Sequence, residues 1–113
     1  MNKLLLSPLA QDDLHEICAY ITDELQNPSA AKNKVAQIVI RLRSLVDFPL
    51  MGASLSSIAD METDYRFLVC GNYTTFYRYE EKTVYVIRVL HNRRDFMKIL
   101  FGHVKENYDD SDE

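Results

Sequence analysis

The chain has no tryptophan and only three glycines, three prolines and two cysteines among its 113 residues. The glycines, Gly52, Gly71 and Gly102, are isolated, so the sequence holds no glycine-rich phosphate-binding loop. No apolar run approaches the roughly 20 residues of a membrane-spanning helix, and the leucines near the N-terminus are too few for a signal peptide. Two cysteines do not make a disulfide framework, which predicts a cytoplasmic protein with no membrane partner.

An excess of basic residues is also absent. The chain has 13 Lys and Arg residues against 17 Asp and Glu residues, for a net charge of −4. Residues 106–113 contribute five of the acids and no base, so residues 1–105 carry 13 bases and 12 acids. This near-neutral body argues against a general nucleic-acid-binding protein. We expect one domain over residues 1–105 and an acidic, disordered tail over residues 106–113.

Two amphipathic helices are predicted in the first half of the chain. Ser7-Pro8 and Asn27-Pro28 are typical helix starts, each with an N-cap residue followed by proline. Apolar residues then recur at helical spacing over residues 8–25 and 28–46. The short break between the two segments predicts an antiparallel helix hairpin.

The periodicity changes to two after residue 64. Residues 65–69, 73–79 and 84–90 are rich in β-branched and aromatic side chains, which predicts an antiparallel meander. A further strand is predicted at residues 3–7 and a short last helix at residues 96–101.

The predicted fold is therefore α+β, with the helix hairpin packed on one face of a mostly antiparallel four-stranded sheet. The other face of this sheet stays partly open, and we expect a binding or catalytic surface there. The long segment between the second helix and the meander is predicted to be an irregular loop.

The residues with the most chemistry follow the last strand. His91, Arg93 and Arg94 come directly after it, and Arg66 on another strand could approach them across the sheet. An imidazole can carry a proton near neutral pH and arginines can hold a phosphate, so this set suits a phosphodiester. The alternative is that the histidine is structural, that Arg93 and Arg94 pair with acids, and that Arg66 and Arg88 are solvated outward positions of their strands.

A metal site is the weaker possibility. Asp12, His15 and Glu16 lie within one helical turn, but such a set is more often a solvated helix face. Cys18 falls on the apolar stripe of the first helix, and Cys70 has no second cysteine at metal-ligand spacing. We therefore predict neither a metal nor a cofactor.

The order of elements and several motifs resemble the RelE/ParE superfamily, the toxins of bacterial type II toxin–antitoxin modules. The resemblance covers residues 3–101 and involves Ser7-Pro8 with Asp12-Asp13-Leu14, Phe48-Pro49 with Gly52, Tyr65-Arg66, Gly71-Asn72-Tyr73 with Phe76-Tyr77-Arg78, and residues 86–95. It implies an antitoxin protein as partner, with operator DNA touched only indirectly through that antitoxin. We expect the antitoxin on the open sheet face, along the first helix and near Arg93 and Arg94.

The resemblance implies two competing activities. ParE-like members poison DNA gyrase, whereas RelE-like members cut messenger RNA on the ribosome without a metal. The Phe-Tyr-Arg run at 76–78 and the Arg-Val-Leu-His run at 88–91 look closer to ParE. The segment 47–64 contains no lysine or arginine, which argues against a RelE-like enzyme. The gyrase inhibitor is therefore the favoured hypothesis, and an inactive interaction module is a third.

Residue roles follow from these alternatives. If the protein is a metal-independent endoribonuclease, Arg66, His91 and Arg94 are its predicted catalytic residues. Arg78, Arg93 and Arg94 are the predicted partner-binding residues.

Overall fold

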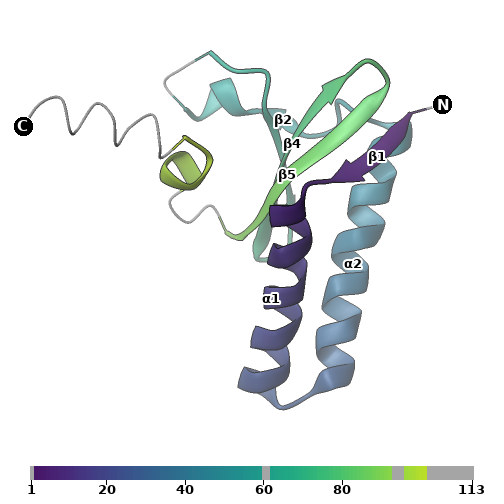
Figure 1. Cartoon of the computed structure of the whole chain (residues 1–113), viewed down its shortest axis with the longest axis vertical. Coiled ribbons are helices and arrows are strands. Elements are labelled where there is room, and N and C mark those ends of the chain that lie inside the picture. Colours follow the sequence, from purple (N-terminus) through teal and green to yellow (C-terminus); the bar gives the residue numbers. More distant parts are fainter. Residues whose placement is uncertain (1, 60–61, 93–95, 102–113) are drawn as a thin grey trace, which may run out of the picture.

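The computed structural model describes residues 2–59, 62–92 and 96–101. The elements in chain order are β1 (Lys3–Leu6), α1 (Pro8–Leu25), α2 (Pro28–Asp47), β2 (Ala53–Ser54), the 3-10 turn η1 (Leu55–Ser57), β3 (Arg66–Cys70), β4 (Tyr73–Glu80) and β5 (Thr83–His91). A short helix at residues 96–101 follows. The predicted α+β fold and element order are confirmed (Figure 1). Arg93, Arg94 and the predicted acidic tail at residues 106–113 lie outside the described residues.

The sheet has five strands in the order β1-β5-β4-β3-β2, and not the four that were predicted. β1 pairs in parallel with β5, and every other neighbouring pair is antiparallel. The additional strand, β2, falls within the segment predicted to be irregular. Its two residues are too few for an alternating pattern to show in the sequence.

Both helices begin at the predicted caps. The Ser7 side chain accepts a hydrogen bond from the Ala10 N–H at 3.0 Å, and the Asn27 side chain accepts one from the Ala30 N–H at 3.1 Å. Between them, Gln26 takes a left-handed conformation with φ of 50°, which ends α1 and reverses the chain. The two helices run side by side in opposite directions (Figure 1). Neither is long and apolar enough to cross a membrane, and this holds for every helix in the described ranges.

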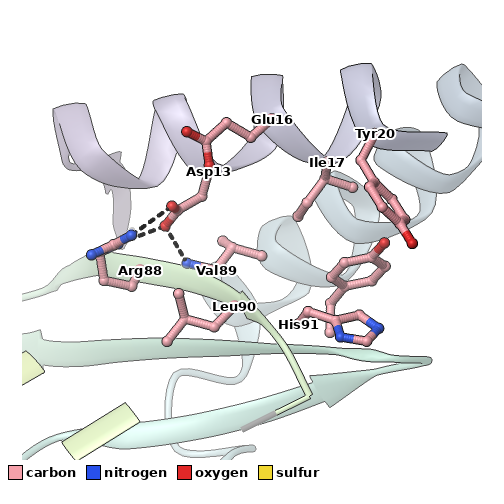
Figure 2. Close-up of a pocket in the computed structure, with 9 residues that line it drawn as sticks. Asp13, Glu16, Ile17, Tyr20, Arg88, Val89, Leu90 and His91 are labelled. Carbon is pink, nitrogen blue, oxygen red and sulfur yellow. Dashed lines mark hydrogen bonds and ion pairs between the residues drawn. The ribbon is translucent and has the colours of Figure 1, made fainter. Parts of the chain in front are cut away.

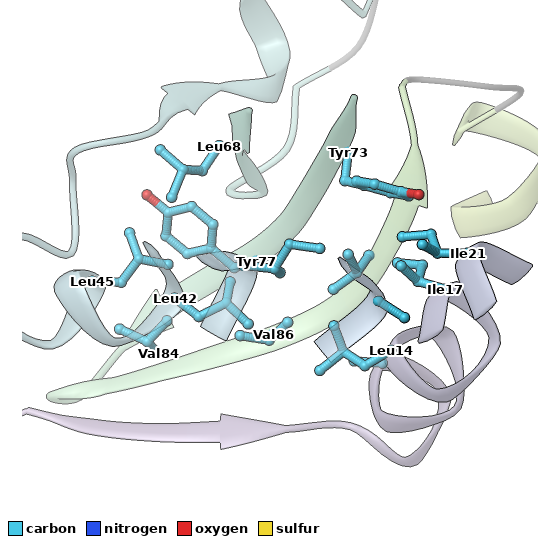
Figure 3. Packing of buried hydrophobic residues seen from close by; sticks show 14 residues of the cluster. Leu14, Ile17, Ile21, Leu42, Leu45, Leu68, Tyr73, Tyr77, Val84 and Val86 are labelled. Atoms are coloured by element: carbon cyan, nitrogen blue, oxygen red, sulfur yellow. The ribbon is translucent and has the colours of Figure 1, made fainter. Parts of the chain in front are cut away.

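The helix hairpin covers one face of the sheet, as predicted. Apolar side chains from α1 and α2 pack against inward residues of β3, β4 and β5 (Figure 3). The buried members of this cluster are Ala10, Leu14, Ile17, Ile21, Ala31, Ile38, Leu42, Leu45, Leu68, Tyr73, Tyr77, Val84, Val86 and Val89. Burial of each large side chain contributes roughly 1.5–3 kcal/mol, so this cluster is the main source of stability.

A second cluster covers part of the opposite face. Phe76 and Leu90 of the sheet pack there with Leu55 of η1 and with the helix at 96–101. The rings of Phe76 and Phe96 stack with centroids 5.4 Å apart. The face that was predicted to be partly open therefore stays open mainly toward β1, where Leu5 and Tyr85 are exposed.

A β-bulge in β5 decides which face the end of that strand presents. Phe76 pairs with Arg88, but the next residue of β4, Tyr77, pairs with Val86. Ile87 therefore has no opposite residue, and the alternation of side chains shifts by one position. As a result Val86 before the bulge and Val89 after it both join the helix-covered cluster.

Candidate functional site

The predicted site residues do not gather on the open face of the sheet. Arg66 is the cross-strand partner of Tyr77, and His91 is the partner of Tyr73. Both tyrosines belong to the helix-covered cluster, so Arg66 and His91 point to the helix-covered face. Arg78, which alternates with Tyr77, points to the opposite face. The expectation that these cations form one surface on the open face is wrong for the described residues, and Arg93 and Arg94 lie outside them.

Arg66 and His91 are also far apart along the sheet. Arg66 pairs with Tyr77 and His91 pairs with Tyr73, four positions away on the same strand. At about 3.3 Å per residue, this spacing separates the two backbone positions by roughly 13 Å along the strand direction. Two residues that act on one phosphodiester need to meet within hydrogen-bond reach of it, and these two do not.

Arg66 holds the loop between α2 and β2. Its Nε donates to the Gly52 carbonyl at 3.1 Å, and its Nη2 donates to the carbonyls of Gly52 at 2.6 Å and Leu50 at 3.1 Å. The buried Tyr77 hydroxyl fixes the same loop, since it donates to the Pro49 carbonyl at 2.8 Å and accepts from the Gly52 N–H at 3.0 Å. The guanidinium therefore acts as a brace for the backbone.

The braced loop presents apolar side chains outward. Phe48, Leu50 and Met51 are all exposed although the backbone that carries them is tied down. The loop also depends on a glycine, because a Cβ atom at Gly52 would lie 2.5 Å from the Phe67 carbonyl oxygen. A rigid loop with exposed apolar side chains is a feature of protein-binding surfaces.

His91 lies at the other end of the helix-covered face, beside a groove of about 400 Å³ between α1 and the end of β5 (Figure 2). Its ring meets the Tyr73 ring edge-on, with centroids 5.4 Å apart. Burial, and after it the nearby Tyr20, raises the pKa of Tyr73. The groove is lined by Asp13, Glu16, Ile17, Tyr20, Tyr73, Arg88, Val89, Leu90 and His91.

A buried ion pair closes one end of this groove. The Asp13 carboxylate accepts hydrogen bonds from Arg88 Nε at 2.7 Å, from Arg88 Nη2 at 2.8 Å and from the Val89 N–H at 2.9 Å (Figure 2). Only 6% of the Asp13 side chain is exposed, against 20% for Arg88. The hydrogen bond to Asp13 is the main reason why the pKa of Arg88 is raised.

The Asp13 carboxylate accepts a backbone hydrogen bond from β5 beyond the point where β1 ends. β1 ends at Leu6, after which the Ser7 N–H still donates to the Val86 carbonyl and the Ser7 hydroxyl to the Ile87 carbonyl. The next donor on this edge, the Val89 N–H, has no strand beside it and uses Asp13 instead. The prediction that Arg88 is a solvated outward residue is therefore wrong.

Sequence reasoning had missed Asp13 and Tyr20 as parts of a site. A signal for Asp13 exists, since it stands three residues after Ala10 and four before Ile17, within the apolar stripe of the helix. A carboxylate at such a position needs a buried partner. Tyr20 carries no comparable signal, because tyrosine is common on exposed helix faces.

Arg78 forms an exposed ion pair on the opposite face. Its Nη2 lies 2.7 Å from Asp64 Oδ2, and its guanidinium carbon lies 5.9 Å from the centre of the Tyr65 ring. The Arg78 hydrogen bond lowers the pKa of Asp64, although 61% of this aspartate side chain is exposed. The Arg78 guanidinium is thus already engaged with Asp64 within the chain.

The weaker metal hypothesis finds no support. Within residues 2–59, 62–92 and 96–101, no three His, Cys, Asp or Glu side chains are placed to hold a metal ion together. This includes Asp12, His15 and Glu16, which are exposed along α1.

Comparison with known proteins decides the family. The model of the family described as "ParE toxin of type II toxin-antitoxin system, parDE" matches residues 4–96. The chain belongs to the ParE toxin family. The resemblance to RelE/ParE toxins is thereby confirmed, and the protein is a toxin of a type II system.

Solved structures share the fold of this ParE-family toxin. A chain from the chromosomal ParDE system of P. aeruginosa has a TM-score of 0.67 at 21% identity, over 80% of this chain and 96% of that one. A chain from the RelBE2 toxin–antitoxin complex of Mycobacterium tuberculosis has a TM-score of 0.58 at 22% identity, with the same coverage. No curated protein sequence matches. The fold alone therefore does not separate ParE-like from RelE-like action.

Proposed function

We propose that this toxin arrests growth by inhibiting DNA gyrase through protein binding, and not by cutting RNA. It acts in the cytoplasm and is neutralised by a cognate antitoxin, as its place in a type II system implies. One observation carries the choice between the two activities. The Arg66 guanidinium donates hydrogen bonds to the Leu50 and Gly52 carbonyls, and the Arg66 backbone lies about 13 Å along the strand direction from that of His91.

The positions of Arg66 and His91 argue against metal-independent RNA cleavage by these two residues. A proton carrier and a phosphate-binding cation have to act on the same few atoms, within hydrogen-bond reach. Arg66 and His91 lie at different ends of the sheet face. The loop that Arg66 braces carries exposed apolar side chains and no lysine or arginine. Apolar residues on a rigid loop suit a protein target better than a ribosomal RNA surface.

The RNase alternative depends on residues outside the described part of the chain. Arg94 is the remaining member of the predicted catalytic set, and Arg93 and Arg94 are also predicted partner-binding residues. Those roles stay predictions, as does the partner-binding role of Arg78.

Purified toxin tests the proposal directly. It is added to gyrase in a DNA supercoiling assay and, in parallel, to translating ribosomes with a defined messenger RNA. We expect loss of supercoiling with an intact messenger RNA, and recovery of supercoiling when the cognate antitoxin is added. Cleavage of the messenger RNA without any effect on gyrase would refute the proposal.

A further inference from the structure

We infer that the groove between α1 and the end of β5 binds a lysine or arginine side chain of the antitoxin. This rests on the toxin–antitoxin part of the proposed function and holds whichever target the toxin has. The groove of about 400 Å³ has the size of a pocket for one long side chain with its neighbours. Its walls combine the rings of Tyr20, Tyr73 and His91 with aliphatic side chains, the Asp13–Arg88 ion pair and the Glu16 carboxylate. Aromatic rings beside a carboxylate recognise a cation with an apolar stem.

The charge around the groove is negative. α1 contains five acidic residues and no lysine or arginine. Asp13 is neutralised by Arg88, which uses its Nε and Nη2 donors on that carboxylate. Glu16, further along the same wall, makes no salt bridge with any described residue. The charge of Glu16 also helps to raise the pKa of Arg88, but the two side chains form no salt bridge. A cation entering the groove could therefore form a direct ion pair with Glu16.

The remaining polar groups of the groove can each accept a hydrogen bond from a ligand. Within the described ranges, the hydroxyls of Tyr20 and Tyr73 and the ring of His91 make no hydrogen bond. Figure 2 shows Tyr20 leaning from α1 toward the sheet, above His91, so that rings line the groove from two sides. A guanidinium or ammonium group could lie against these rings and donate to Glu16 and to a tyrosine hydroxyl.

The antitoxin is the partner that this site fits best. Its binding has to be tight enough to silence the toxin, and tight interfaces are centred on a few anchors, often arginine, in aromatic pockets. Tyr20 is 62% exposed on the isolated toxin, a large share for an aromatic side chain that lines a groove. Covering it with a partner side chain removes this apolar surface from water.

Glu16→Lys tests the inference, with Glu24→Lys as the matched control because both glutamates are exposed on α1 and only Glu16 lines the groove. The affinity of each variant for the cognate antitoxin is measured by surface plasmon resonance. We expect Glu16→Lys to bind at least about tenfold more weakly, the effect of losing a charge-assisted contact, and Glu24→Lys to bind nearly as wild type. Tyr20→Ala should show a loss of similar size.

A charge exchange identifies the contact. Each lysine and arginine of the antitoxin is changed to glutamate, and one such change should weaken binding to the wild-type toxin and restore binding to Glu16→Lys. Equal affinities for Glu16→Lys and Glu24→Lys, or no restoring change, would overturn the inference. So would a Glu16→Lys toxin that keeps its antitoxin affinity but no longer inhibits gyrase, because the groove would then belong to the target. Failure of the wild-type toxin to inhibit gyrase would refute the proposed function and leave these affinities valid.

Discussion

The two ends of the helix-covered face of the sheet use similar residues for different purposes. At the Arg66 end, a guanidinium and a tyrosine hydroxyl form hydrogen bonds with backbone carbonyls and an amide, and the surface they support is apolar. At the His91 end, an arginine is engaged with Asp13, and the imidazole and tyrosine hydroxyls beside it face a groove. One end is a braced protrusion, and the other is a hollow lined by polar and aromatic groups.

Residue type alone therefore does not define a catalytic set. Arg66 and His91 would serve RNA cleavage if they met, but the register of the strands separates them. Arg66 instead braces the loop before β2, and His91 lines the groove beside α1. Removing the interactions that define each end measures how much that end depends on them.

The largest loss of stability is expected at the His91 end of the sheet face, for Asp13→Ala. This change leaves the Arg88 guanidinium and the Val89 N–H without their acceptor, so we expect the free energy of unfolding to fall by about 3–5 kcal/mol. Urea denaturation of the purified toxin measures the loss. The control is Asp12→Ala, an exposed neighbour, which should cost less than about 0.5 kcal/mol. Equal stabilities of the two variants would show that the carboxylate does not secure the end of β5.

A smaller loss of stability is expected at the Arg66 end of the sheet face, for Tyr77→Phe. Without the hydroxyl, the buried Gly52 N–H loses its acceptor and the Pro49 carbonyl loses a donor, at an expected cost of about 1–3 kcal/mol. Tyr85→Phe is the control, because Tyr85 is an exposed residue of the same sheet. Urea denaturation compares the two, and faster hydrogen exchange at the Gly52 amide should accompany the loss in Tyr77→Phe alone. An unchanged Gly52 exchange rate would argue against the brace.

The smallest effect is expected for Asp64→Ala, which removes the exposed ion pair with Arg78. We expect less than about 1 kcal/mol at neutral pH, because solvent screens a pair whose aspartate is 61% exposed. The pKa of Asp64 is lowered in the folded protein, so its contribution is complete above the ordinary aspartate pKa of about 4 and is lost as the pH falls through the lowered value. Unfolding curves of wild type and Asp64→Ala should therefore converge in strong acid. A difference that grows toward acid pH would contradict this assignment.

Much of the fold could be predicted from the sequence because it depends on local signals. Caps at Ser7 and Asn27, helical spacing after them and the alternating segments that follow all act over short distances along the chain. The two-residue β2 carries too little pattern to be recognised. The helix at 96–101 was predicted, but its packing on the second face depends on tertiary contacts.

The site was harder to predict, and the bulge at Ile87 explains why. Strict alternation from Val86 would place His91 on the face away from the helices, whereas the unpaired Ile87 shifts it toward α1. The sequence likewise gives no sign that Arg66 is used within the chain. The loop geometry shows that its guanidinium donates hydrogen bonds to the Leu50 and Gly52 carbonyls. Register and bulges are set by pairing between strands, which composition does not reveal.

The choice between gyrase inhibition and RNA cleavage is tested most directly in cells. Gyrase-linked DNA breaks and messenger RNA ends are measured in the same cells shortly after the toxin is induced without antitoxin. The separation of Arg66 from His91 predicts that gyrase-linked breaks rise while transcripts stay intact. Cleavage of transcripts within their coding frames before any rise in DNA breaks would contradict it.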